Sequence, residues 1–92
     1  MFGDEPKYVI VEERGHEMAI VFNRILDHTQ VVGPMMRVVA AGFVCIGETG
    51  DVAVRGESVK LELAQRNNPN IKGFKSRPED AFLIIQAIDL PR

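Results

Sequence analysis

The longest apolar run of the chain is VVAAGFVCI, residues 38–46, and it decides the expected fold. A strand without polar alternation is typical of a central strand whose two faces are both covered. Gly42 interrupts the run, and a glycine inside a strand indicates a bulge or the close approach of another backbone. We therefore expect residues 35–47 to contain the central strand of a sheet.

Two further strands are expected before this run. Residues 7–13 and 17–22 are both short and rich in apolar side chains, and Arg14 and Gly15 stand between them. Glycine readily takes the positive φ that a tight hairpin turn needs. The sequence thus predicts an N-terminal hairpin, followed by a single helical turn that Asn23 would cap.

Two more strands and a helix are expected downstream. Residues 52–54 are a short apolar segment, and in residues 58–63 apolar and polar side chains alternate, which is typical of a strand with one wet face. Ser76 to Glu79 has the form of a helix-capping box. The apolar side chains that follow share one helical stripe, namely Ala81, Ile84, Ile85 and Ile88.

The composition agrees with a sheet-rich domain. Of 92 residues, 46% are hydrophobic and 26% charged, and 11 Val and 8 Ile stand against 5 Leu. Branching at Cβ suits the pleated surface of a sheet better than a helix. We expect one compact α+β domain over residues 1–92. Its small, mostly antiparallel sheet would have about five strands, curled or barrel-like, with the C-terminal helix packed on it.

Several classes of protein are excluded by simple features of the chain. No apolar run reaches the roughly 18–20 residues that span a bilayer. The N-terminal segment carries Asp4 and Glu5, unlike a basic and apolar secretory signal. Cys45 is the only cysteine, which excludes an intramolecular disulfide framework and a cysteine-rich zinc site. We expect a cytoplasmic protein without membrane contact, and the net charge of -2 argues against a wholly basic surface.

No catalytic constellation is recognisable. We expect His16 and His28 to be surface or capping residues, because their spacing matches no common zinc site and no nucleophile accompanies them. Cys45 lies in the apolar run and is expected to be a small buried hydrophobe. The sequence therefore predicts no catalytic residue, cofactor or metal. A small enzyme that uses His16 or His28 is a third hypothesis, after the two given at the end of this section.

The best candidate for binding is the loop of residues 66–77, hereafter the basic loop. It carries four cations, no acid and an aromatic residue in a chain that is otherwise net negative. Cations attract phosphate, and an exposed aromatic ring can stack on a base. The alternative is a solvated loop whose Phe74 or Ile71 packs back onto the core. The candidate site residues for a partner or a nucleic acid are Arg66, Lys72, Phe74, Lys75 and Arg77.

Three short segments resemble small bacterial and phage-associated proteins to which no function is assigned. These are residues 40–43, AAGF, residues 56–59, GESV, and residues 75–81, KSRPEDA. The resemblance covers parts of the C-terminal half. It implies a small accessory protein and no particular activity, and it makes residues 66–74 look like an insertion between a strand and a helix.

The leading functional hypothesis is a non-enzymatic interaction module that associates with itself, as a homo-oligomer, or with another protein. The predicted strands carry more apolar character than one small sheet needs, and an unpaired strand edge is a template for association. Nucleic-acid binding through the basic loop is the alternative hypothesis.

Overall fold

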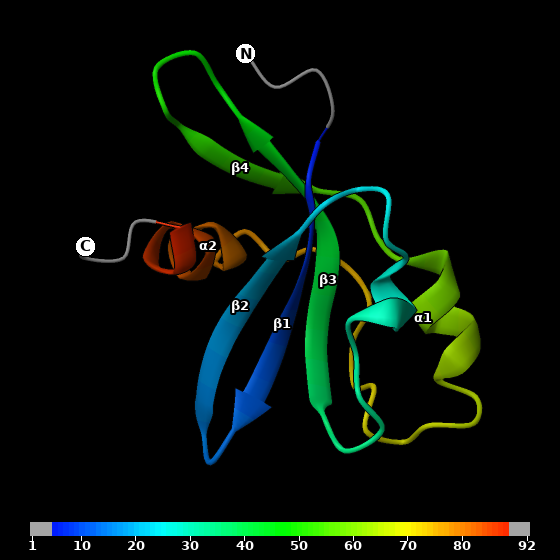
Figure 1. Ribbon diagram of the computed structural model, residues 1–92. Coiled ribbons are helices and arrows are strands. Elements are labelled where there is room, and N and C mark those ends of the chain that lie inside the picture. Colours follow the sequence, from blue (N-terminus) through cyan, green and yellow to red (C-terminus); the bar gives the residue numbers. More distant parts are fainter. Residues whose placement is uncertain (1–4, 89–92) are drawn as a thin grey trace.

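A four-stranded antiparallel sheet organises the computed structural model, which describes residues 5–88 (Figure 1). Asp4 therefore lies outside the described residues. The strands follow the order β2-β1-β3-β4 in the sheet. Their bounds are β1 (Lys7–Glu13), β2 (His16–Phe22), β3 (Arg37–Ile46) and β4 (Val52–Arg55). The helical elements are η1 (His28–Gln30), α1 (Val59–Ala64) and α2 (Asp80–Ile88).

The N-terminal hairpin is confirmed. Its register pairs Glu13 with His16 and Lys7 with Phe22, so a two-residue turn joins β1 to β2. Both turn residues have positive φ, 56° at Arg14 and 82° at Gly15. This is the primed turn whose twist matches that of the flanking strands.

The expected α+β class is confirmed, with two corrections to the sheet. It is open and ends at β2 and β4, so over the described residues it is not closed into the barrel that we gave as one possibility. It also has four strands and not about five, because the segment predicted as a fifth strand forms helix α1.

Helix α1 replaces that strand because its start is well capped. The side chain of Ser58 accepts a hydrogen bond from the Leu61 N–H, which satisfies one of the free donors of the first turn. The sequence KLELA that follows consists of good helix formers. Only Leu61 is buried, while Val59 and Leu63 are more than half exposed. The apolar and polar residues of this segment therefore alternate without forming a strand, because a six-residue helix is too short for its sequence to show a clear helical period.

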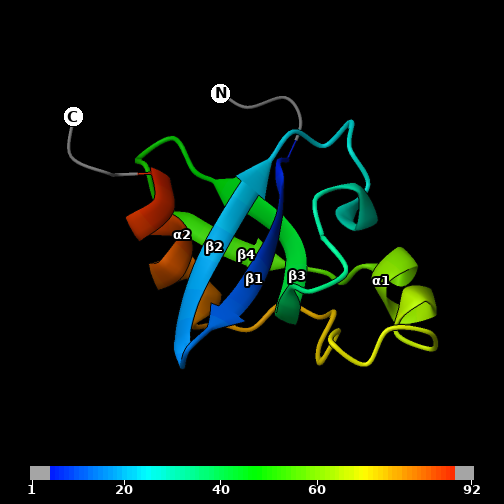
Figure 2. The same cartoon turned by 60° about the horizontal axis from the view of Figure 1, so that its bottom comes forward.

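Each face of the sheet is covered by different elements (Figure 2). On one face, α2 packs against β2 and β4 and brings Ile84 against Tyr8, Ile10 and Val44. On the opposite face, α1 brings Leu61 against Val9, as part of a cluster to which the segment before β3 and the basic loop also contribute. The prediction that residues 38–46 are a central strand covered on both sides is confirmed.

Helix α2 packs on the sheet as expected, but with a different stripe. It begins at Asp80, whose carboxylate accepts a hydrogen bond from the Arg77 N–H. The carboxylate that reaches back to a backbone N–H before the helix is therefore that of Asp80 and not, as the sequence suggested, that of Glu79. Ile84 is buried, whereas Ile85 and Ile88 are about 40% exposed. The expected stripe was wrong at these two positions because the buried Asp80 fixes which side of the helix faces the sheet.

The backbone of the basic loop lies directly along β3. Ile71 forms a parallel bridge with Val38, and the Gly73 N–H donates to the Val38 carbonyl. A Cβ at Gly73 would lie 2.2 Å from the Val39 carbonyl oxygen. Close approach is also confirmed at Gly42, where a Cβ would lie 2.7 Å from the Arg55 carbonyl oxygen. Both contacts require residues without a side chain.

We predict that Gly73→Ala destabilises the protein by at least about 2–3 kcal/mol, because the added methyl forces the loop away from β3. Gly47→Ala is the matched control, since the nearest atom to a Cβ there is 3.9 Å away. Urea unfolding followed by circular dichroism measures both changes. Equal stability of the two variants would contradict the close packing of the loop.

Candidate functional site

The structure divides the five predicted residues of the basic loop into two groups. Arg66, Lys72 and Lys75 are exposed, and the Lys75 Nζ lies 6.0 Å from the centre of the Phe74 ring. Phe74 itself is half-buried and packs against the cluster around Leu61. The packing of Phe74 on the core agrees with the alternative stated for this loop, and it leaves three cations on the surface.

Arg77 is held by two carboxylates. Its Nη2 lies 2.8 Å from a Glu17 oxygen on β2 and 2.8 Å from Asp80 Oδ1 on α2. Asp80 is fully buried, and its other oxygen accepts the hydroxyl of Tyr8 at 2.6 Å. These four residues form one network, hereafter the Asp80 network, which joins β1, β2 and α2.

Three groups of the Asp80 network, Tyr8, Arg77 and Glu17, have pKa values shifted away from neutral pH. Burial raises the pKa of the Tyr8 hydroxyl far above its usual value, and the hydrogen bond to Asp80 raises it further. The hydrogen bond with Glu17 raises the pKa of the Arg77 guanidinium, which in turn lowers the pKa of Glu17. Near neutral pH, Tyr8 and Arg77 therefore remain proton donors and Glu17 remains an acceptor, as a structural network requires.

His28 is buried, which corrects the expectation of a surface or capping residue. Its Nε2–H donates to the Gly42 carbonyl at 3.0 Å, and its ring lies edge-on to Phe22 and Phe43. Burial lowers the pKa of the imidazole. His28 is thus a neutral packing residue that ties η1 to β3, whereas His16 is exposed.

Cys45 is half-buried, which differs from the buried position that we expected. Its thiol donates to Glu5 at 2.7 Å, and Arg55 binds the same carboxylate through its guanidinium. The hydrogen bond to Glu5 raises the pKa of the thiol, so Cys45 is a weak nucleophile at neutral pH. That conclusion agrees with the sequence, although its cause is a carboxylate and not burial in apolar surroundings.

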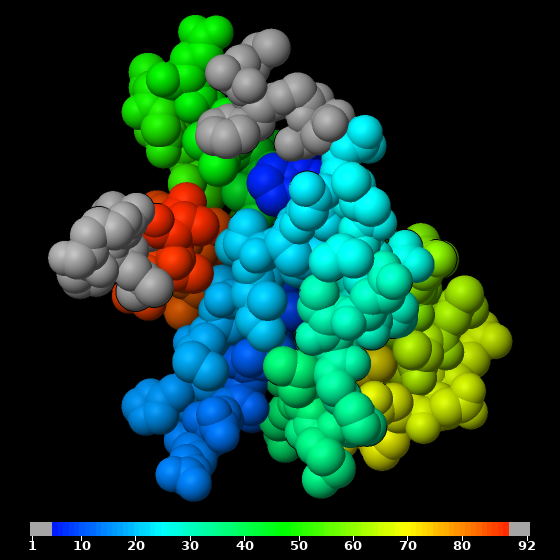
Figure 3. All heavy atoms as spheres, in the orientation of Figure 1, coloured from blue at the N-terminus to red at the C-terminus, as the bar shows by residue number. Residues whose placement is uncertain are grey.

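A surface that the sequence did not single out lies along β2. This strand is at the end of the sheet, and no other strand of residues 5–88 pairs with its outer side. In the space-filling view β2 lies on the front of the molecule beside α2 (Figure 3). Met18 in the middle of this strand is 49% exposed. An exposed apolar side chain on a free edge strand marks a candidate interaction surface.

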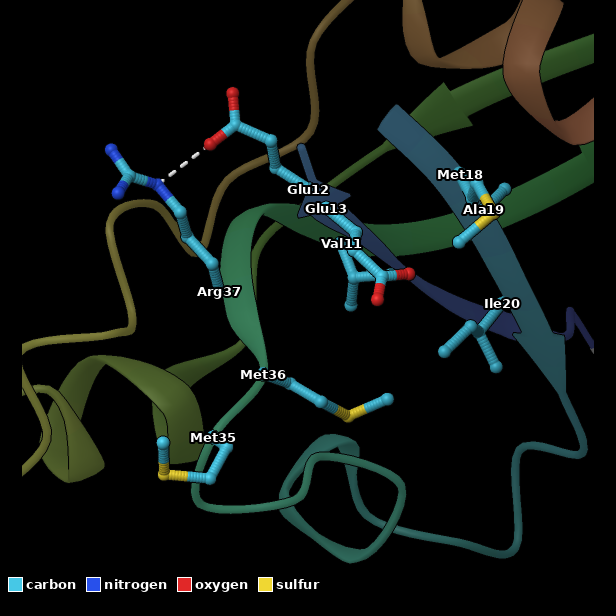
Figure 4. A pocket seen from close by; sticks show the side chains of 9 residues that line it. All are labelled: Val11, Glu12, Glu13, Met18, Ala19, Ile20, Met35, Met36 and Arg37. Carbon is cyan, nitrogen blue, oxygen red and sulfur yellow. Dashed lines mark ion pairs between the residues drawn. The ribbon is translucent and has the colours of Figure 1, made fainter. Parts of the chain in front are cut away.

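Hollows flank β2 on both faces of the sheet. The larger one, hereafter the methionine pocket, has a volume of about 420 Å³ and combines Met18 with Met35 and Met36. Figure 4 shows Met36 and Ile20 pointing toward one another across it, with the ion pair of Glu12 and Arg37 at its rim. The second hollow, of about 350 Å³, lies between β2 and α2 and is lined by Glu17, Met18, Ala19, Leu83, Gln86 and Ala87.

Residues 5–88 contain neither a cluster of metal-ligating side chains nor a helix that could cross a membrane. Within this range no cluster of three or more His, Cys, Asp or Glu residues is arranged to hold a metal ion. The helices of the same range are too short or too polar to cross a membrane. The edge of β2 with its two hollows is therefore the candidate on which the functional proposal is built.

We predict that Tyr8→Phe lowers the free energy of unfolding by about 1–3 kcal/mol, because it removes a hydrogen bond to a buried carboxylate. Lys60→Met is the control, since it removes an exposed ion pair with Asp27 and costs at most about 1 kcal/mol. Urea unfolding measures both variants. A Tyr8→Phe protein as stable as the Lys60→Met protein would contradict the role of the Asp80 network.

Acid should destabilise the protein through His28. Burial lowers the pKa of its imidazole below 6.5. As the pH falls through 6.5, His28 of the unfolded chain therefore binds a proton while His28 of the folded chain stays neutral. The stability is fully present above about pH 7.5 and falls below about pH 6.5, by up to about 1.4 kcal/mol per pH unit. The lowered pKa values of Glu5, Glu17 and Asp27 affect stability only below about pH 4.5.

Urea unfolding at pH 7.5 and pH 5.5 measures this effect. His28→Gln keeps a donor for Gly42 and should flatten the pH dependence, while His16→Gln, at an exposed histidine, should retain it. A parent protein with the same stability at both pH values would refute the assignment to His28.

No protein-family model, curated protein or solved structure matches the chain.

Proposed function

We propose that this protein is a non-enzymatic interaction module that associates with itself by pairing along the open edge of β2. The observation that carries the proposal is the combination of a seven-residue edge strand with apolar hollows on both of its faces. A strand edge supplies main-chain hydrogen bonds to an added strand, and the neighbouring hollows receive its side chains.

The backbone of β2 has groups free to form such bonds. In a hairpin with a two-residue turn, the pair that flanks the turn is hydrogen-bonded, and bonded pairs then alternate along the strands. Met18 and Ile20 therefore direct their N–H and C=O groups toward β1. Glu17, Ala19 and Val21 direct theirs away from the sheet, where no other strand of residues 5–88 lies.

Residues 18–22 of β2 lack several of the features that usually protect an edge. Proteins block exposed edges with lysines, prolines, bulges or very short strands. Residues 18–22, MAIVF, contain neither a charge nor a proline, and the pairing of β1 with β2 is regular throughout. The opposite edge, β4, is only four residues long and ends at Arg55. The asymmetry of the two edges favours association through β2.

The chemistry of the remaining side chains favours association over catalysis or nucleic-acid binding. His28 and Cys45, the groups with catalytic potential, are engaged with a carbonyl and a carboxylate. In the basic loop, Arg77 is engaged with Glu17 and Asp80, and Phe74 packs on the core. Three cations remain exposed there, which is weaker support than the strand edge.

Light scattering across a concentration series tests the proposal, and we expect the apparent mass to rise from one chain toward two. Met18→Lys places a charge on the edge strand and should raise the dissociation constant at least about tenfold, or about 1.4 kcal/mol. Ile25→Lys is the matched control, because Ile25 is 82% exposed and lies outside the strand.

Ala19→Pro supplies a second variant, because it removes an N–H that faces away from β1, and proline is tolerated at such edge positions. It should also be monomeric while keeping its circular dichroism spectrum. A parent protein that remains monomeric up to about 1 mM would overturn the proposal, since association weaker than that is negligible.

A further inference from the structure

We propose that β2 of a second copy pairs antiparallel with β2 of the first. In this pairing the two Ala19 residues face one another across the twofold axis. In this arrangement Met18 of one copy lies opposite Ile20 of the other, beside the methionine pocket. The inference rests on the proposed self-association and adds to it a register and the residues that each copy contributes.

Symmetry restricts the possible registers. When two identical antiparallel strands pair about a twofold axis, the axis runs between the strands. If residues of the same backbone orientation are paired, the residue next to the axis faces its own counterpart in the other copy, and the axis is named here by that residue. The groups that form new bonds belong to Glu17, Ala19 and Val21, so the strongest pairings place these residues opposite one another. The axis therefore lies next to one of these three residues or next to a residue between them.

The middle of the strand favours Ala19. β2 runs from His16 to Phe22, and an axis at Ala19 pairs all seven residues of one copy with all seven of the other. Moving the axis to Glu17 carries the partner past the start of the strand, so that Gly15 faces the partner's Ala19 and fewer residues of β2 are paired. Moving it to Val21 pairs Phe22 with Ile20 but carries the partner past the end of the strand, so that Arg24 faces the partner's Met18.

Both faces of β2 accept the partner in the Ala19 register. On the face of the methionine pocket, the two Met18–Ile20 pairs add apolar side chains next to Met36. Methionine is flexible and adapts its shape to an incoming side chain. On the other face, Ala19 is small and lines the second hollow together with Leu83 and Ala87.

The charges at the ends of the paired strands are already neutralised. In the Ala19 register, Glu17 lies opposite the partner's Val21. Its carboxylate is bound by Arg77 within its own chain at 2.8 Å. Pairing therefore does not bring an uncompensated charge against an apolar side chain, which would otherwise oppose association.

Disulfide trapping tests the register. Cys45→Ser removes the only cysteine and keeps a hydroxyl donor for Glu5. Met18→Cys and Ile20→Cys are then introduced into separate chains of this background. In the Ala19 register, positions 18 and 20 of different copies form a non-hydrogen-bonded pair with Cα atoms about 4.5 Å apart, which suits a disulfide. Like positions are diagonal neighbours and lie too far apart.

We expect mild oxidation to cross-link the mixture of the two variants but neither variant alone. The cross-linked fraction should approach roughly half of the dimers, the statistical share of mixed pairs. Cross-linking of Met18→Cys alone or of Ile20→Cys alone would overturn the Ala19 register in favour of an axis at that residue.

Light scattering on the same unoxidised samples separates the two proposals. A dimer that gives no cross-link in any sample would refute the register while the self-association stands. A monomer in every sample would refute the self-association itself, and the register with it.

Discussion

The arrangement of the sheet and α2 depends on the hydrogen bonds of one fully buried carboxylate, that of Asp80. An unpaired carboxylate in this position would cost several kcal/mol, so its partners must be in place when the helix packs. Tyr8 supplies a hydroxyl from β1, and Arg77 supplies its backbone N–H and its guanidinium. The Arg77 guanidinium also reaches Glu17 on β2. These bonds fix the rotation of α2 and thereby expose Ile85 and Ile88 while burying Ile84.

The edge of β2 pairs with no other strand of residues 5–88. Leu83 and Ala87 of α2 line the hollow beside this strand, and the hairpin register directs the backbone groups of Glu17, Ala19 and Val21 away from β1. On the opposite face, Met36 fills only part of the space beside Ile20. The same packing that completes the core therefore produces an edge with a hollow on each side.

The sequence predicted the parts of the fold that local patterns determine. The Arg14–Gly15 turn and the apolar run of β3 were located correctly, because turn geometry and burial depend on nearby residues. The helix at residues 59–64 was not predicted, because two signals in the same short segment disagree. Ser58 favours a helix start, whereas the alternation of apolar and polar residues favours a strand. Neither the burial of His28 nor the engagement of Arg77 could be predicted, since their partners Gly42 and Glu17 are 14 and 60 residues away in the sequence. The β2 edge likewise depends on strand order, which no local pattern records.

Hydrogen exchange at individual amides of β2, measured by NMR at a low and a high protein concentration, tests the central claim most directly. The amides of Met18 and Ile20 are bonded to β1 and should be protected at both concentrations. The amides of Glu17, Ala19 and Val21 should exchange rapidly in the dilute sample and at least about tenfold more slowly in the concentrated one, because pairing with a second copy protects them. Rapid exchange of these three amides at both concentrations would contradict the account.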